Sequence, residues 1–273
     1  MSLFCCPHCA LPLRREANEY HCSSGHRFDV AREGYVHLLP ANRKHSANPG
    51  DDREMVMARA RFLEKGWYAP LRDALCHLAL THTPPGGVVV DAGCGEGWYS
   101  QGLWNCLTKA DLHPRLVGVD LSRAAVKKAA RRVTEGEFAI ASVYRLPLAD
   151  GCAHLLLDCF APLALAEYRR VLRPGGIFLY VVPGPRHLFE LKTVLYDRPY
   201  ENRVEQDTYP GLTLRDMVAV DFSMDIRDRK TLLDLFRMTP YAWKTPREGV
   251  ERLEALDGLA VTASFQILVL KAT

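Results

Sequence analysis

Apolar residues recur along this chain with two different spacings, which alternate from residue 88 onward. Short runs rich in valine, isoleucine and leucine predict strands at 88–91, 116–120, 138–141, 155–159, 177–182, 218–226 and 259–269. Helical patterns follow Gly97, Ser122, Leu163 and Arg186. Strands separated by helices form a parallel sheet with both faces covered, and the last strand alternates well enough to pair antiparallel with its neighbour. We therefore predict an α/β fold with a mostly parallel, seven-stranded sheet.

The pattern before residue 88 divides into three parts. Asp51 and Glu54 form a capping-box pattern that begins a helix, Gly66 ends it, and a second helix follows Pro70. Residues 41–49 are polar and lack periodicity, so we interpret them as a solvated linker, with ordering on a phosphate backbone as the alternative. The predicted division is an N-terminal module at 1–40, a linker at 41–50 and a large domain at 51–273.

Composition narrows the class of protein only slightly. The chain has 273 residues, of which 48 % are hydrophobic and 25 % charged, as in ordinary globular proteins. A net charge of +3 permits a nucleic-acid partner without requiring one, and we interpret the cationic face of the helix after Ser122 as solvated. No run of about eighteen apolar residues occurs, and the first residues lack the pattern of a signal peptide. We therefore expect a cytoplasmic protein with no membrane contact.

Cysteines gather near the N-terminus, where their spacing is typical of a metal site. Cys6 and Cys9 form a C-x-x-C pair, and Cys22 and His26 form a C-x-x-x-H pair after twelve intervening residues. Two thiolates on one tight turn, with a thiolate and an imidazole on another, supply the tetrahedral set that structural zinc prefers. We predict that these four residues bind Zn²⁺ and that the module folds only with the metal bound. The alternative ligands are Cys5, His8 and His21.

A glycine-rich turn follows the first strand of the alternating region. Asp91 ends that strand, and Gly93, Gly95 and Gly97 stand at alternate positions before a helix. Such glycines let the backbone approach a ligand closely, and the helix directs free N–H groups at the same point. Asp120 ends the next strand, where a carboxylate would accept both hydroxyls of a ribose. The arrangement predicts a nucleoside cofactor, either a nicotinamide dinucleotide or S-adenosylmethionine.

The spacing of the glycines distinguishes between these two cofactors. It is G-x-G-x-G, unlike the G-x-G-x-x-G of dinucleotide-binding folds, and it resembles the D-x-G-x-G-x-G motif of class I methyltransferases. A second motif, L-R-P-G-G at 172–176, is similar to the turn before the fifth strand in that class. The resemblance implies a Rossmann-like class I methyltransferase fold that binds S-adenosylmethionine. It also implies that Glu96 in the loop and Ser142, beside the adenine, bind the cofactor.

Further motifs, spread over most of the chain, resemble those of the bacterial 23S rRNA (guanine-N1)-methyltransferases. They are C-P-x-C at 6–9, C-x-x-G-H-x-F-D at 22–29, A-R-E-G-Y-V-x-L-L-P at 31–40, and the segments 62–73 and 183–188. The resemblance implies methylation of N1 of a specific guanine in a 23S rRNA hairpin near the peptide exit tunnel, with the zinc module recognising RNA. It implies in addition that Tyr68 and His187 contact the cofactor.

Transfer of a methyl group to guanine N1 requires a way to handle the proton that N1 carries at neutral pH. A general base or a cationic hydrogen-bond donor is therefore expected near the transferred methyl group. Asp158 lies at the end of the fourth strand, and His187 follows the fifth, on the rim where the methyl group would lie. These two residues are the catalytic candidates, with His187 assigned first to the cofactor and with an ordinary loop carboxylate as the alternative for Asp158.

The resemblance leaves the substrate and the partners partly open. It implies a 23S rRNA hairpin or a large-subunit assembly intermediate as partner, and a homodimer, because family members are known as dimers. The motifs are shared by two branches that methylate neighbouring guanines, so the target guanine is not assigned. A small-molecule methyltransferase of the quinone or antibiotic type is the alternative, because such enzymes share the glycine loop and the L-R-P-G-G turn. The zinc module favours RNA, since small substrates do not require one.

Overall fold

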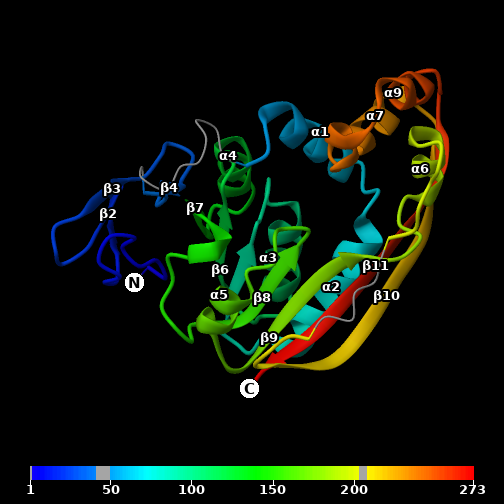
Figure 1. The fold of residues 1–273 in the computed structure, drawn as a ribbon. Helices are drawn as coiled ribbons and strands as arrows, with labels where there is room; N and C mark the ends of the chain where they lie inside the picture. Colours follow the sequence, from blue (N-terminus) through cyan, green and yellow to red (C-terminus); the bar gives the residue numbers. More distant parts are fainter. Residues whose placement is uncertain (1, 41–49, 203–207) are drawn as a thin grey trace.

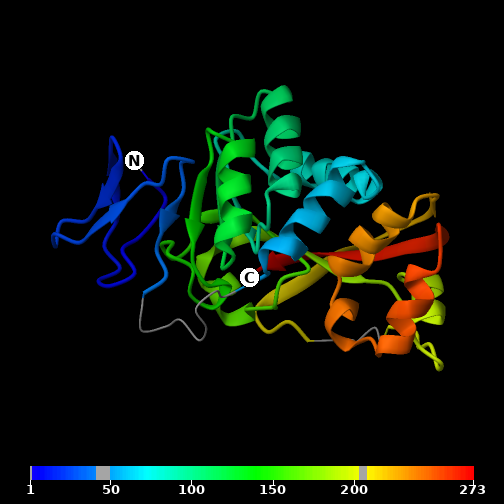
Figure 2. The same cartoon turned by 90° about the horizontal axis from the view of Figure 1, so that it is seen from above.

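The computed structural model describes residues 2–40, 50–202 and 208–273. Residues 41–49 of the predicted linker, which runs from 41 to 50, therefore lie outside the described residues. Within them, an eight-stranded sheet runs through the molecule, and a three-stranded sheet lies near the N-terminus (Figure 1). The N-terminal module and the helices near the C-terminus lie at opposite ends of the large sheet (Figure 2).

The large sheet has the strand order β10-β11-β9-β8-β5-β6-β7-β4. Its strands are β4 (Val36–His37), β5 (Val88–Ala92), β6 (Arg115–Asp120), β7 (Glu137–Ile140), β8 (Ala153–Cys159), β9 (Leu172–Pro183), β10 (Leu212–Ile226) and β11 (Leu259–Ala272). The six strands β9, β8, β5, β6, β7 and β4, in this spatial order, all pair in parallel with their neighbours. Strand β11 pairs antiparallel with both β9 and β10. The alternation of strands and helices thus forms the mostly parallel, Rossmann-like sheet that the sequence predicts.

The sheet has one strand more than the seven that were predicted. Val36 and His37 pair with Ala139 and Ile140 of β7, so the added strand comes from the N-terminal module. Two residues are too few for a periodic pattern to show in the sequence. As a result, the module contributes the edge strand of the large sheet.

Strand β9 begins earlier than the pattern indicated. Ala153 of β8 pairs with Leu172, whereas Leu155 pairs with Ile177, so residues 173–176 leave the ladder. Gly175 adopts a φ of +76° in this segment. Pro174 followed by a left-handed Gly175 is the pattern of a type II turn, so the L-R-P-G-G motif forms the predicted turn, and only Leu172 pairs with β8 before it.

All six predicted helices are present, with small differences at their ends. They are α1 (Arg53–Glu64), α2 (Ala69–His82), α3 (Trp98–Lys109), α4 (Arg123–Arg132), α5 (Leu165–Val171) and α6 (Phe189–Leu195). Three further helices, which were not predicted, lie between β10 and β11: α7 (Arg229–Arg237), α8 (Tyr241–Lys244) and α9 (Arg247–Glu254). Asp52, not the predicted Asp51, caps α1, because its side chain accepts a hydrogen bond from the Met55 N–H. Across the part of the chain that is described, none of these helices has the length and apolar character needed to cross a bilayer.

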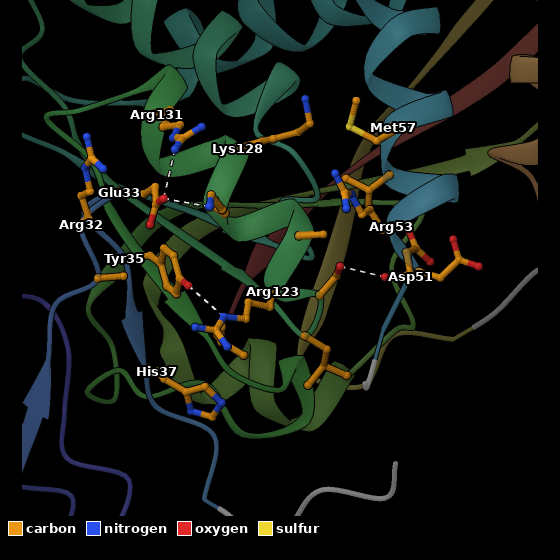
Figure 3. Close-up of a pocket in the computed structure, with 18 residues that line it drawn as sticks. Arg32, Glu33, Tyr35, His37, Asp51, Arg53, Met57, Arg123, Lys128 and Arg131 are labelled. Atoms are coloured by element: carbon orange, nitrogen blue, oxygen red, sulfur yellow. Dashed lines mark hydrogen bonds and ion pairs between the residues drawn. The ribbon is translucent and has the colours of Figure 1, made fainter. Parts of the chain in front are cut away.

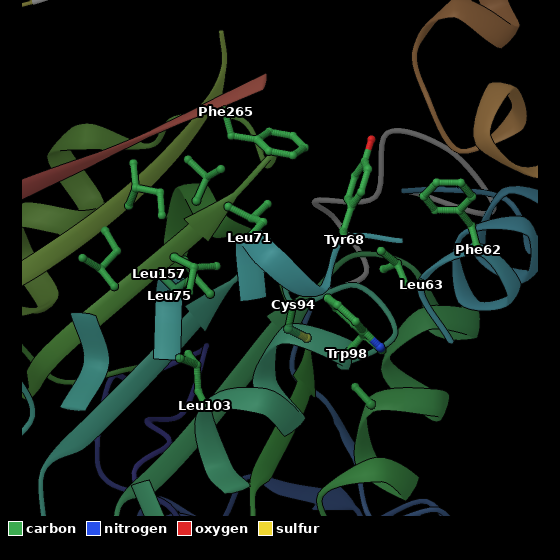
Figure 4. Packing of buried hydrophobic residues seen from close by; sticks show 14 of the residues in the cluster. Phe62, Leu63, Tyr68, Leu71, Leu75, Cys94, Trp98, Leu103, Leu157 and Phe265 are labelled. Carbon is green, nitrogen blue, oxygen red and sulfur yellow. The ribbon is translucent and has the colours of Figure 1, made fainter. Parts of the chain in front are cut away.

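Two hydrophobic clusters pack on opposite faces of the large sheet. Val89 belongs to the first cluster and Val90 to the second, as expected for neighbours in a strand. The first cluster includes residues of helices α1 to α4 (Figure 4). The second includes Phe4, Leu13 and Tyr20 of the N-terminal module, all of them buried. The module therefore shares a core with the large sheet.

Candidate cofactor and zinc sites

The four predicted zinc ligands lie together in the structure. The ligand atoms of Cys6, Cys9, Cys22 and His26 are all within 4.8 Å of one another. Cys6 Sγ and Cys22 Sγ lie 3.5 and 3.4 Å from His26 Nδ1, and Cys9 Sγ lies 3.7 Å from Cys22 Sγ. Tetrahedral zinc with ordinary bond lengths requires about 3.5 Å between sulfur and nitrogen and about 3.7 Å between sulfurs. The donor set and its spacing therefore fit Zn²⁺.

Backbone contacts explain how the two ligand pairs meet. The Ala10 N–H donates to the Cys6 carbonyl, and the Gly25 N–H donates to the Cys22 carbonyl, which closes one turn around each pair. Between and after these turns, β1 (Arg14–Glu16), β2 (Glu19–His21) and β3 (Arg27–Asp29) form the small antiparallel sheet. Among the described residues, the metal-ligand cluster consists of the four predicted side chains only.

The three glycines after β5 adopt left-handed backbone conformations but serve different purposes. Gly93, Gly95 and Gly97 have φ values of +84°, +53° and +81°. A Cβ on Gly93 would lie 2.4 Å from Ala161, and a Cβ on Gly97 would lie 2.7 Å from Ala129. Protein atoms therefore leave no space for a side chain at these two positions. A Cβ on Gly95 would find no atom nearer than 3.8 Å. Gly95 therefore faces open space, which a ligand can occupy.

The ends of β6 and β7 bring two further predicted residues to the same edge. Asp120 is tied to the glycine loop, because its carboxylate accepts from the Gly95 N–H at 3.0 Å and from the Ser122 N–H at 2.7 Å. Ser142 follows β7 and caps a short 3₁₀ helix, η2 (Val143–Arg145). Since β6 and β7 are neighbours, Asp120 and Ser142 lie where ribose and adenine are expected.

Two other acidic side chains of the loop region are buried. Asp91 accepts from the Ser100 hydroxyl at 2.5 Å, and burial raises its pKa to about 7. Burial also raises the pKa of the Glu96 carboxyl. Glu96 Oε1 has no hydrogen-bond partner among the described residues. A buried carboxylate oxygen without a partner is costly, so Glu96 is suited to a donor group on a ligand.

Tyr68 and His187 form part of one aromatic wall, with Phe265 between them. The Phe265 ring lies 5.0 Å from the Tyr68 ring and 4.5 Å from the His187 ring (Figure 4 shows Tyr68 and Phe265). His187 Nδ1 accepts from the Ser264 N–H at 3.2 Å, so in the neutral ring the proton is on Nε2. Burial, with a smaller effect of Lys192, lowers the pKa of His187 to about 3. His187 is therefore a neutral hydrogen-bond donor at working pH.

Asp158 differs from the expectation of an acid on the rim. It is fully buried, and its carboxylate accepts from the Tyr168 hydroxyl at 2.8 Å and from the Ala161 N–H at 2.9 Å. Burial raises its pKa to about 7. Phe160, next in this loop, is half exposed with a φ of +68°. The geometry of Asp158 is that of a residue that holds the loop after β8.

A cleft that the sequence did not predict lies between the N-terminal module, the start of α1 and helix α4. It has a volume of about 1110 Å³ (Figure 3). Its lining includes six cationic side chains, Arg32, Arg53, Arg123, Lys127, Lys128 and Arg131, and three acidic ones, Glu33, Asp51 and Asp52. Glu33 pairs with Lys127 and Arg131 at 2.9 and 3.0 Å. The cationic face of α4 is therefore part of a cleft rather than simply solvated.

Comparisons with known proteins agree with both parts of this architecture. Residues 4–47 match a zinc-ribbon family model described as "RlmA, N-terminal", and residues 89–176 match one described as "Methyltransferase domain". The chain is 37 % identical over 273 residues to the 23S rRNA (guanine(748)-N(1))-methyltransferase of Streptomyces fradiae, covering 97 % of this chain and 95 % of the relative. It is 34 % identical over 288 residues to a Micromonospora griseorubida protein named "Putative 23S rRNA (guanine-N(1)-)-methyltransferase", covering 96 % and 95 %.

These similarities extend over nearly the whole of each chain and include both the zinc ribbon and the cofactor-binding half. Together with the parallel sheet, the glycine loop and the Cys/His cluster, they make this an S-adenosylmethionine-dependent methyltransferase with a structural zinc ion. The chain belongs to the 23S rRNA (guanine-N1)-methyltransferase family.

Proposed function

We propose that this enzyme methylates N1 of a single guanine in a 23S rRNA hairpin near the peptide exit tunnel. The observation that carries the proposal is the full-length similarity to a relative named for guanine-N1 methylation of 23S rRNA. The physical support is that both halves needed for such an enzyme are present and lie side by side. One half is the cofactor edge of the sheet, and the other is the zinc module with its cationic cleft.

The cleft supports RNA as the acceptor rather than a small molecule. Its cationic side chains outnumber its acidic ones, and Arg32, Arg53 and Lys128 form no ion pair among the described residues. Free cationic side chains along a groove suit a phosphate backbone, whose negative charges repeat at short intervals. Leu121, Ser122 and Ile140 also line the cleft, so it reaches the ends of β6 and β7. An RNA strand in the cleft would therefore lie close to the cofactor.

The predicted site residues divide into three tasks under this proposal. The cofactor supplies an electrophilic methyl group on a sulfonium, and it is bound by Tyr68, Asp91, Gly95, Glu96, Asp120, Ser142 and His187. Gly93 and Gly97 serve cofactor binding by shaping the loop, because protein atoms close both positions. Cys6, Cys9, Cys22 and His26 hold zinc. His187 also offers its Nε2–H to stabilise charge on the guanine, whereas Asp158 positions the loop after β8. The occupied Nδ1 and the low pKa make His187 unsuited to the role of general base.

The proposal also covers the domain division, the cellular location and the oligomeric state of the enzyme. We keep the domain division at 1–40, 41–50 and 51–273. The short strand β4 belongs to the first part and pairs with β7 of the third. An rRNA substrate implies that the enzyme acts in the cytoplasm, on the hairpin itself or on a large-subunit assembly intermediate. We expect a homodimer, which light scattering on the purified protein would test.

Methyl transfer from labelled S-adenosylmethionine to large-subunit rRNA tests the function directly. The rRNA is prepared from a strain that lacks the gene, both as naked RNA and as assembly intermediates. We expect label on guanine N1 at one hairpin position, which mass mapping would identify. Absence of label in both forms of RNA, with cofactor binding intact, would contradict the proposal and favour a small-molecule acceptor.

A further inference from the structure

Arg59 on helix α1 was not recognised as a site residue in the sequence, yet its side chain reaches the cofactor loop. The guanidinium Nη1 lies 2.5 Å from Asp51 Oδ2 and 3.8 Å from the position of a Cβ on Gly95. The side chain is only 23 % exposed. Burial opposes its charge, yet Asp51, Glu96 and Asp120 together hold the pKa of Arg59 above its usual value. Arg59 is thus a largely buried cation above the one loop glycine that faces open space.

The hydrogen-bonding capacity of Arg59 is mostly unused. A guanidinium has five N–H donors, but within the described ranges the only ion-pair partner of Arg59 is Asp51. In Arg132, the other arginine near Glu96, each of the three guanidinium nitrogens donates a hydrogen bond. It donates to the Glu96 carbonyl, to Gln101 and to Glu64. Arg59 therefore has N–H donors available for an acceptor at the glycine loop.

We propose that Arg59 binds the α-carboxylate of S-adenosylmethionine. A guanidinium matches a carboxylate in charge and in planar, two-point geometry, and the cofactor has no other anionic group. Glu96 Oε1 is buried and has no partner in the described part of the chain, so it is suited to the ammonium group of the same amino-acid end. The zwitterionic end of the cofactor would thus meet one fixed charge of each sign. The proposal concerns the cofactor alone and does not depend on the identity of the methyl acceptor.

The test compares two ligands that differ only in the carboxylate. S-adenosylhomocysteine and its decarboxylated analogue are titrated by calorimetry into the full-length, zinc-loaded protein. In the unmodified protein, we expect the carboxylate to strengthen binding by about tenfold to hundredfold, the usual range for a charge-assisted pair. In Arg59→Met, S-adenosylhomocysteine should lose most of that advantage, whereas the decarboxylated analogue should bind as before. Lys109→Met, at the exposed C-terminal end of α3 and outside the cleft, is the matched control for cofactor affinity.

Two outcomes would overturn the proposal. Equal weakening of both ligands in Arg59→Met would mean that Arg59 only supports the loop, and unchanged binding of both would mean that it has no role. Arg59→Lys covers the case in which Arg59→Met does not fold, because it keeps the charge and loses the planar fork. In Arg59→Lys, the ratio of the two affinities should fall below that of the unmodified protein. An unchanged ratio there would also contradict the assignment.

Discussion

At the scale of single residues, burial determines the protonation states at the cofactor edge. Asp91 and Asp158 both have pKa values near 7, and His187 has one near 3. Each shift favours the neutral form, as expected when a titratable group is removed from water. The sequence identified these three residues as chemical candidates, but their environment decides which form is present.

His187 is expected to stay neutral over the whole working range of the enzyme. Replacing it by leucine, which has no N–H donor, should weaken S-adenosylhomocysteine binding by about tenfold, through loss of a buried hydrogen bond. The shape of the rate–pH profile between about pH 5.5 and 8.5 should not change, because a pKa of about 3 lies far below that range. Single-turnover methylation and calorimetry would measure both effects. His77→Leu on the exposed face of α2 is the control, and a step near pH 6.5 that disappears with His187 would contradict this view.

Asp91 should make the cofactor-free protein less stable as the pH rises. Its pKa is about 7 in the folded protein, against an ordinary value of 3.8, so the folded state holds a proton that the unfolded state has lost. Its stabilising contribution is therefore present below about pH 4 and is lost as the pH rises through 7. Asp91→Asn should raise stability at pH 8 by on the order of 2–4 kcal/mol and have little effect at pH 4.

Thermal unfolding of the Asp91→Asn variant at the two pH values would measure this. Cofactor affinity should fall in the same variant, because the carboxylate lies at the proposed cofactor edge. An equal change in stability at both pH values would indicate a packing effect instead of titration.

At the scale of elements, helix α4 has two roles that depend on different faces. Its apolar residues Val126 and Ala129 pack in the core, whereas its cationic residues line the cleft beside the N-terminal module. Three of those cations are held in place: Glu33 pairs with Lys127 and Arg131, and Tyr35 accepts from Arg123. The contacts orient the cationic face toward the space between the two parts of the molecule.

Reversal of the free charges in the cleft should weaken RNA binding selectively. Arg32→Glu with Lys128→Glu is expected to lower rRNA affinity by at least about tenfold. It should also reduce the dependence of log affinity on log salt by about 0.7 for each lost phosphate contact. Cofactor affinity should be unchanged. Filter binding over a salt series would measure this, with Lys109→Glu at the exposed end of α3 as the control. An equal loss in that control would indicate a general charge effect.

At the scale of the whole molecule, the zinc module and the large sheet share one hydrophobic core. Phe4, Leu13 and Tyr20 are buried in the same cluster as β-strand residues, and β4 extends the large sheet. The Cys5 N–H also donates to the Pro147 carbonyl at 2.7 Å. Because the module covers part of one sheet face, its unfolding would expose the core of the large domain.

Loss of zinc should therefore destabilise the complete chain. Cys9→Ser, or chelation of the metal, is expected to lower the melting temperature in a single transition that includes the cofactor-binding half. Differential scanning calorimetry with and without S-adenosylhomocysteine would measure this. Cys106→Ser, on α3 outside the metal cluster, is the control. Two separate transitions, of which only one responds to zinc, would show that the module is an independent unit.

The sequence by itself determined the features whose signals are local along the chain. The alternation of strands and helices predicted the mostly parallel sheet, because burial on both faces leaves a period in each segment. The positions of Gly93, Gly95 and Gly97 indicated the cofactor loop, because a left-handed backbone excludes most other residues. The spacing of the Cys and His pairs indicated zinc, because two short turns can supply a tetrahedral set.

Only the tertiary structure decided the features that depend on contacts between distant segments. In the sequence, Arg59 occupies a polar position of an amphipathic helix, and no neighbouring residue relates it to Gly95. Ser264 fixes the tautomer of His187 from 77 residues away. The cationic cleft and the shared core exist because the N-terminal module packs against the sheet edge beside α4. Periodicity records which face of an element is buried, but it carries no information about which other element covers that face.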